Sequence, residues 1–422
     1  MSRMPRFIQA ATLVAALLLA SAPAGSAESG SAGPAGPAFA ANDPPLPRPR
    51  AAQDTNAPPP AAAPSATAAA PAAGTITDDT VRYIAGLQPS AASPLAAFTR
   101  DESWLQHARS LDRTFGELDR TQLARVRTWA KSKLLVRSPA MFYMFSGPDF
   151  MYADAFFPAA TTYVLAGLEP VGQIPDLLKM QRASIVPSLH SVASSMRTLL
   201  SVSFFITHNM RTELSSGRLS GTIPVLYIFI ARAGKTVHEV SLVNLDEDGM
   251  ERPEAPGLKS AAHGVKIVFS GRDGRRQTLY YFSTNLANDG VGNSGLLKFL
   301  ERLGPADSFI KSASYLLHSG NFSKIRDFLV AHSSTILEDD SGIPLAYFDR
   351  QKWQVQPFGH YLTPLGIFPG TYQPKLQELF KKAPAPPMDF GVGYRWRPNE
   401  SNLLLAVRND AATGTAGASG TP

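Results

Sequence analysis

The chain has 422 residues, a formal net charge of +6 and no cysteine. Without cysteine it has no disulfides, no thiolate metal ligands and no cysteine nucleophile, and we expect no lipid-bearing cysteine after a signal sequence. Its 44% hydrophobic and 18% charged residues are typical of a globular protein. Because the Lys and Arg residues are dispersed, the charge pattern does not favour nucleic-acid binding.

The first 74 residues predict an exported protein. Arg3 and Arg6 precede an apolar run over residues 10–20, and small residues follow up to Ala27, as in a secretory signal peptide spanning residues 1–27. Residues 28–74 are rich in Pro and Ala, a composition that favours extended chain and predicts a disordered linker. We therefore expect a periplasmic or secreted protein, with cleavage or retention of the signal peptide left open. Beyond the signal peptide, no segment has the roughly 18 consecutive apolar residues that a membrane span requires.

Residues 75–407 are expected to form one globular domain, followed by a disordered tail over residues 408–422. Helical spacing, as at Trp104, Ala108 and Leu111, predicts helices over residues 101–133, 188–200, 295–302, 307–318, 322–333 and 374–382. Runs of β-branched and aromatic residues predict strands over residues 202–206, 225–231, 237–245, 265–269 and 278–283. Their short connections favour antiparallel pairing. The order of elements predicts an α+β fold in which helices pack on a mostly antiparallel sheet.

Familiar catalytic and metal-binding motifs are incomplete in this sequence. Gly234-Lys235-Thr236 lacks the first glycine of a phosphate-binding loop, and the acidic run at residues 244–249 has Ala255 where a calcium loop requires a glutamate. Neither His-Glu-x-x-His nor Gly-x-Ser-x-Gly occurs. We therefore predict no metal site and no cofactor.

Two acidic segments are candidate catalytic sites. Asp149 and Asp154 lie among aromatic residues that include Tyr152, and aromatic walls raise the pKa of a carboxyl group towards the range useful for acid catalysis. The alternative is that Asp149 caps a helix. Asp340 belongs to a run of three acids that suits a cation or a catalytic base, or forms a solvated helix end. His360 in the following aromatic loop is the expected partner.

A third segment, residues 391–397, combines glycines, aromatic rings and arginines. The rings of Tyr394 and Trp396 beside Arg395 suit sugars or anionic polymers, and Tyr361 and Tyr152 are further candidate ligand-binding residues. The alternative is an edge strand whose arginines extend into solvent. An envelope glycan or an anionic surface is therefore the expected partner.

Several phrases resemble an uncharacterised family of exported bacterial proteins. They are Phe-Ser-Gly-Pro-Asp-Phe at 145–150, Gly-Leu-Glu-Pro-Val-Gly at 167–172, Asp-Asp-Ser-Gly-Ile-Pro at 339–344 and Tyr-Arg-Trp-Arg-Pro at 394–398. The resemblance spans most of residues 101–407, and it implies no activity and no site. From the residues themselves we expect a ligand-binding or structural protein of the cell envelope. The alternative is a hydrolase or lyase that uses Asp149, Asp154 or Asp340 as acid or base.

Overall fold

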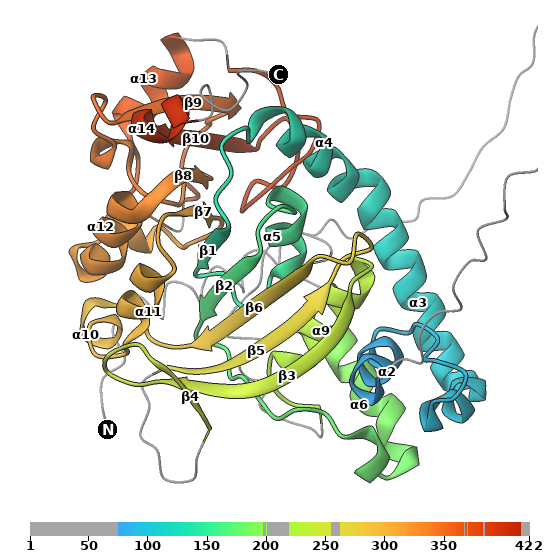
Figure 1. Cartoon of the computed structure of the whole chain (residues 1–422). Coiled ribbons are helices and arrows are strands. Elements are labelled where there is room, and N and C mark those ends of the chain that lie inside the picture. Colours follow the sequence, from blue (N-terminus) through green and yellow to red (C-terminus); the bar gives the residue numbers. More distant parts are fainter. Residues whose placement is uncertain are drawn as a thin grey trace, which may run out of the picture.

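The computed structural model describes residues 75–196, 200, 219–254, 262–366, 368, 370–382 and 385–414. The expected signal peptide, the linker and the expected strand at 202–206 lie outside these ranges. The described residues build one α+β domain around a ten-stranded mixed sheet with the order β4-β3-β5-β6-β2-β1-β7-β8-β10-β9 (Figure 1). The strands are β1 (Ala140–Met144), β2 (Thr162–Gly167), β3 (Thr236–Leu245), β4 (Glu251–Pro253), β5 (His263–Ser270), β6 (Arg276–Ser283), β7 (Ala306–Ile310), β8 (Ser333–Glu338), β9 (Trp353–Gly359) and β10 (Asn402–Arg408).

The centre of the sheet is parallel and its two flanks are antiparallel. Strands β6, β2, β1, β7 and β8 run parallel to one another, whereas the pairings that add β5, β3 and β4 on one side and β10 and β9 on the other are antiparallel. Five of the nine pairings between described strands are antiparallel, and the predicted antiparallel pairing of the segments at 237–245, 265–269 and 278–283 is confirmed. In chain order the parallel strands are arranged 3-2-1-4-5, which is the order of a doubly wound sheet.

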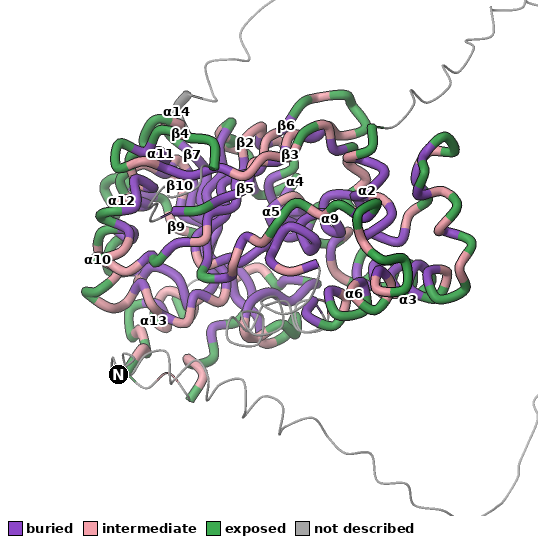
Figure 2. Tube along the Cα trace, turned by 90° about the horizontal axis from the view of Figure 1, so that it is seen from below, coloured by how far each residue is buried: buried purple, intermediate pink, exposed green. Residues whose placement is uncertain are grey.

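Helices cover both faces of the sheet, because alternate side chains of each central strand point to opposite sides. Met141 and Tyr143 of β1 pack in one core and Phe142 and Met144 in the other. The first core contains residues of α2 (Ile76–Ile84), α3 (Glu102–Leu118), α4 (Ala124–Lys133), α5 (Phe150–Phe156), α6 (Arg182–Ser195) and α9 (Ile223–Arg232). The second contains residues of α10 (Asn288–Val291), α11 (Leu296–Arg302), α12 (Ser323–His332) and α13 (Pro374–Lys382). Figure 2 shows the buried strands between helices whose outer turns are exposed.

Two predicted elements are wrong, for the same physical reason. Residues 225–231, predicted as a strand, belong to helix α9, in which every residue from Ile223 to Ala231 is buried. Residues 307–318, predicted as a helix, begin in strand β7, in which all five residues are buried. An element that is buried on all sides has no apolar stripe, so periodicity does not separate helix from strand.

The other predicted helices are confirmed, although some boundaries differ. A π-helical turn at Asp119–Leu123 joins α3 to α4 within residues 101–133, and α6 begins at Arg182, before the predicted start at 188. After β10 the chain continues into a short helix, α14 (Asn409–Gly414). Among the described residues, no helix is both long enough and apolar enough to cross a lipid bilayer.

Candidate functional site

The sheet topology indicates where a site is expected, namely beyond the carboxyl ends of the parallel strands. On one side of β1 the sheet continues through β2 and β6, and on the other side it continues through β7 and β8. In doubly wound sheets the ligand-binding crevice lies at such a switch point, beyond the carboxyl ends of the strands. We therefore expect a site among the residues that follow β1, β7 and β8.

Backbone strain is concentrated at this same edge. Among the described residues, the non-glycine positions with positive φ are Phe145 (62°), Ser312 (53°), Ser314 (51°) and Tyr315 (53°). Phe145 directly follows β1, and the other three lie in the loop that directly follows β7. Each such residue costs about 1–2 kcal/mol, and strain of this kind clusters at functional sites.

A buried ion pair lies between the segments that follow β1 and β7. Asp149 Oδ2 accepts a hydrogen bond from Lys311 Nζ at 2.7 Å and another from the Tyr143 hydroxyl at 2.9 Å. The two charged side chains are only 1% and 2% exposed, and Lys311 Nζ lies 3.9 Å from the ring centroid of Tyr152. Burial lowers the pKa of Lys311, and the charges of Asp149 and Asp339 oppose this shift.

Asp149 also caps helix α5, because its Oδ1 accepts a hydrogen bond from the backbone N–H of Tyr152 at 3.2 Å. The helix N-terminus in such folds is the usual seat of a phosphate group. Here the carboxylate of Asp149 occupies that place, so a bound anion is not the chemistry of this end of α5.

The acidic residue after β2 is enclosed in the same way. Glu169 is 1% exposed and its Oε2 accepts a hydrogen bond from the Tyr281 hydroxyl at 3.3 Å. A Cβ at Gly167 would lie 2.3 Å from Glu169 Oε2, and one at Gly147 would lie 3.4 Å from the same atom. The two glycines therefore make the space that this carboxylate fills.

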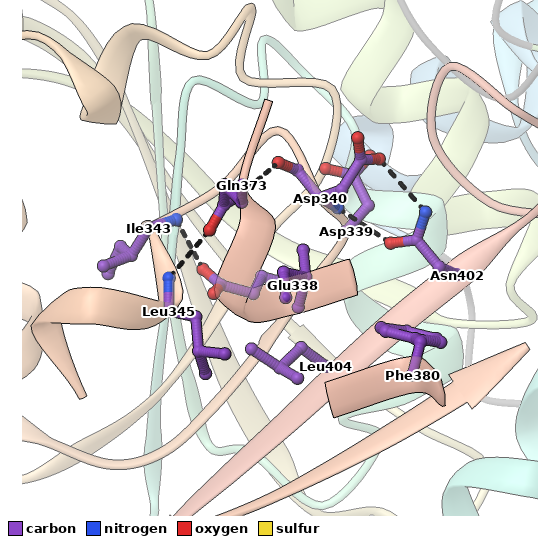
Figure 3. Close-up of a pocket in the computed structure, with 10 residues that line it drawn as sticks. Glu338, Asp339, Asp340, Ile343, Leu345, Gln373, Phe380, Asn402 and Leu404 are labelled. Carbon is purple, nitrogen blue, oxygen red and sulfur yellow. Dashed lines mark hydrogen bonds between the residues drawn. The ribbon is translucent and has the colours of Figure 1, made fainter. Parts of the chain in front are cut away.

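Three consecutive acidic residues lie at the carboxyl end of β8, namely its last residue and the two residues that follow it. Glu338 and Asp339 are buried and Asp340 is half-buried. Glu338 Oε2 accepts a hydrogen bond from the backbone N–H of Ile343 at 2.7 Å, and burial raises its pKa well above the ordinary value. The side chain of Glu338 points away from the other two carboxyl groups, which lie close together (Figure 3).

Asp339 ties the end of β8 to the strained loop. Its Oδ2 accepts a hydrogen bond from the backbone N–H of Ser312 at 2.9 Å, and its Oδ1 accepts bonds from the backbone and hydroxyl of Ser341. Burial, followed by the neighbouring charge of Asp340, raises the pKa of Asp339 to about 7, although these hydrogen bonds favour its charged form.

Asp340 is the least enclosed of the three. Its Oδ2 accepts a hydrogen bond from the Tyr315 hydroxyl at 2.6 Å and its Oδ1 accepts one from Asn402 Nδ2 at 3.1 Å. The backbone N–H of Asp340 donates to Asn402 Oδ1 at 2.9 Å, so one asparagine fixes both the main chain and the side chain (Figure 3). Burial raises the pKa of Asp340, while these bonds and the positive charge of Arg395 act against the shift.

The three carboxyl groups line a small pocket whose cavity volume is about 10 Å³. Its polar wall also contains Gln373 and Asn402, and its apolar wall comes from Leu345, Leu376, Phe380 and Leu404 together with Ile343 (Figure 3). A cavity needs roughly 10–15 Å³ to hold one water molecule. The pocket is therefore a recess of about that size beside Asp340, and a ligand that bonds to Asp340 lies outside it.

Several of the predicted site residues come together around Asp340. The Tyr394 hydroxyl donates to the carbonyl of Ser312 at 2.9 Å, and the Tyr361 hydroxyl accepts from the backbone N–H of Gln373 at 3.3 Å. Arg395 and Trp396 follow Tyr394 in the same turn, and the positive charge of Arg395 acts on Asp340. Tyr152 and Asp149 lie next to this group but are buried in the Lys311 network.

Two predicted site residues, Asp154 and His360, are not among the hydrogen-bond partners of Asp340 in the described part of the chain. Asp154 pairs with Lys235 at 2.9 Å and accepts a hydrogen bond from the Tyr163 hydroxyl at 3.3 Å, which places it near the amino end of β2. His360 is exposed, and its backbone N–H donates to the carbonyl of Ser401 at 2.8 Å.

Sequence reasoning identified the run of three acids that contains Asp339 and Asp340, but it missed Lys311, Ser312, Tyr315 and Asn402 as parts of this cluster. Lys311 and Ser312 lay within a predicted helix, whereas a lysine that follows a short buried strand is a usable signal for the end of a parallel strand. Asn402 carries no such signal, because it reaches Asp340 only through the pairing of β8 with β10.

No protein-family model matches the chain, and neither a curated protein nor a solved structure matches it. Within the part of the chain that the structure describes, no group of three or more His, Asp or Glu residues is arranged to hold a metal ion.

Proposed function

We propose that the protein is an exported ligand-binding protein of the cell envelope, and that Asp340 is its principal polar contact. The single observation that carries this proposal is the contrast between Asp340 and its charged neighbours. Asp149, Lys311, Glu338 and Asp339 are all buried, whereas Asp340 is half-buried at a pocket. The export part of the proposal rests on residues 1–74.

The surroundings of Asp340 support binding of a ligand that donates hydrogen bonds. A carboxylate oxygen has more than one lone pair, so each oxygen of Asp340 accepts a further bond besides those from Tyr315 and Asn402. The partners of Asp340 come from β10 and the loop after β7, which fixes the carboxylate in place without enclosing it. A preorganised acceptor of this kind binds hydroxyl or amino groups with little loss of side-chain entropy.

Thermal unfolding of the mature protein in the presence of glycan fragments, peptides and amino acids tests this proposal. A ligand that binds only the native state raises the melting temperature. We expect one class to raise it in the wild type and in Asp154→Asn, and not in Asp340→Asn, each compared with its own ligand-free value. An equal rise in Asp340→Asn, or no rise with any class, would contradict the proposal.

A second candidate function is a carboxylate-dependent hydrolase or lyase. The observation that favours it is the pair formed by Asp339 and Asp340, in which burial and the charge of Asp340 raise the pKa of Asp339 to about 7. Neighbouring carboxyl groups that titrate apart are the usual basis of acid–base catalysis. Because Asp339 is enclosed by Ser312 and Ser341, Asp340 would contact the substrate and Asp339 would tune its protonation. Turnover of a bound ligand that survives Asp340→Asn would exclude this function.

A further inference from the structure

We infer that the ligand is a neutral carbohydrate chain that binds at the half-buried carboxylate of Asp340, over the mouth of its pocket, and across an exposed aromatic rim beside it. This inference rests on the proposed binding function and adds the chemical class of the ligand. We define the rim as Leu362, Tyr372, Arg395 and Trp396.

The rim brings together two segments that are distant in sequence. Leu362, Tyr372 and Trp396 are 44%, 49% and 40% exposed, although each has a large apolar side chain. The guanidinium of Arg395 donates two hydrogen bonds to the carbonyl of Thr363, the shorter at 2.7 Å, and so joins the turn at residues 391–397 to the loop after β9. The two segments therefore form one surface.

The rim is continuous with the pocket. The Tyr372 ring stacks on the Tyr361 ring, with centroids 6.4 Å apart and planes 15° apart. The next residue, Gln373, lines the pocket, and its Nε2 donates to the carbonyl of Asp340 at 3.3 Å. A chain whose end contacts Asp340 therefore extends over the rim.

The chemistry of the rim and pocket favours a sugar over other polar ligands. Exposed tyrosine and tryptophan rings offer flat faces against which the C–H groups of a pyranose ring pack, while its hydroxyl groups need carboxylate, amide and guanidinium partners. Asp340 and Arg395 supply the carboxylate and the guanidinium beside the rings, whereas Asn402 is buried and its amide is bonded to Asp340. A purely apolar ligand would remove water from the remaining acceptor positions of Asp340 and donor positions of Arg395 without replacing it.

The charge of this surface favours a neutral sugar over an acidic one. Arg395 is balanced by Asp340, whose pKa responds to its charge, and Arg397 lies 3.6 Å from the carboxylate of Glu400. Two positive and two negative groups leave no excess positive charge to attract a uronic acid or a phosphate. Acidic polysaccharides and peptides are therefore the competing outcomes of the test.

The test measures binding of soluble neutral oligosaccharides of two to six sugars, namely cello-, malto- and chito-oligosaccharides, by isothermal titration calorimetry. Oligogalacturonates and a mixed peptide library are the competing probes. We expect at least one neutral series to bind with an affinity that rises with chain length. Trp396→Ala and Tyr372→Ala should each weaken the longest member at least tenfold, whereas Trp396→Phe, which keeps a ring face, should stay within about threefold.

Met250→Ala is the matched control, because Met250 is 45% exposed beside β4, at the opposite edge of the sheet, and should not affect binding. Melting temperatures show whether the variants are folded, and Trp396→Phe keeps the test informative if Trp396→Ala does not fold. If a sugar binds through Asp340 but Trp396→Ala and Tyr372→Ala bind it as tightly as the wild type, the rim is not used and the inference fails while the proposed function stands. The inference also fails, and the proposed function stands, if only peptides or acidic sugars bind in an Asp340-dependent manner. If no probe binds in an Asp340-dependent manner, the inference and the proposed function both fail.

Discussion

Replacing Lys311 with methionine should destabilise the protein by about 3–5 kcal/mol, because it leaves a buried carboxylate without its counter-charge. The Lys311 and Asp149 side chains are 2% and 1% exposed, and Lys311 Nζ lies 2.7 Å from Asp149 Oδ2. After the substitution, Asp149 retains hydrogen bonds from the Tyr143 hydroxyl and from the backbone of Tyr152. These bonds do not replace a positive charge in an environment from which water is excluded.

The double variant Lys311→Met with Asp149→Asn separates the loss of charge balance from the loss of packing. Asparagine is as good a helix cap as aspartate, so α5 keeps its N-terminal acceptor. Replacing both charged partners of a buried pair is often nearly neutral, whereas removing one is costly. The double variant should therefore be more stable than Lys311→Met alone by about 2 kcal/mol or more.

Urea unfolding at neutral pH measures these differences. With a slope of about 3 kcal/mol per molar urea, a loss of about 3–5 kcal/mol lowers the midpoint by about 1–1.7 M. Lys382→Met is the control, because the Lys382–Glu378 pair is 73% and 59% exposed and its loss should change stability by less than about 0.5 kcal/mol. A loss below about 1 kcal/mol in Lys311→Met, or no recovery in the double variant, would refute the reasoning.

Three further substitutions test other parts of this edge. Gly393→Ala should lower the free energy of unfolding, measured with urea, by at least about 2 kcal/mol more than Gly274→Ala. Both glycines have φ near +73°, but only at Gly393 would a Cβ meet Asp339 Oδ2, at 2.0 Å. Equal losses of stability in the two variants would contradict this. Because burial raises the pKa of Asp339 from 3.8 to about 7, the native state keeps a proton that the unfolded state releases. The free energy of unfolding should therefore fall as the pH rises from about 4 to 7, by up to about 1.4 kcal/mol per pH unit for this group. Asp339→Asn should reduce that slope. An unchanged slope in Asp339→Asn would show that Asp339 ionises normally. Asp154→Asn breaks the ion pair between Asp154 and Lys235, in which the two side chains are 14% and 10% exposed. It should lower the melting temperature and leave the dissociation constant of any Asp340-dependent ligand unchanged. Weaker binding would place Asp154 in the site.

The sequence predicts the flanks of the fold better than its centre. The strands at 237–245, 265–269 and 278–283 have short connections, so their antiparallel pairing follows from local information. The parallel strands are joined instead by longer connections that contain helices, and two elements of this part of the fold, β7 and α9, are buried on all sides. The fold class could therefore be predicted, whereas the parallel order of the central strands could not.

The same limit applies to the candidate site. Asp340, Tyr361, Tyr394 and Arg395 are candidates because acidic, aromatic and basic residue types occur together in short segments, and the structure places the other three near Asp340. Asp154 belongs by composition to the same segment as Asp149, but one further turn of helix directs it to the opposite end of the strands. Residue type and spacing identify candidates, and only the pairing of β1, β7, β8 and β10 decides which of them meet.

The strained loop after β7 and the acidic end of β8 depend on each other. Three residues with positive φ, Ser312, Ser314 and Tyr315, cost about 3–6 kcal/mol together. Asp339 accepts from the backbone of Ser312 and Asp340 accepts from the Tyr315 hydroxyl, and hydrogen bonds to charged groups contribute about 1.5–3 kcal/mol each. The two magnitudes are similar, so the carboxylates are sufficient to hold the loop in its strained form. A ligand hydroxyl that bonds to Asp340 Oδ2 would share the oxygen that accepts from the Tyr315 hydroxyl, and binding there is therefore coupled to the conformation of the loop.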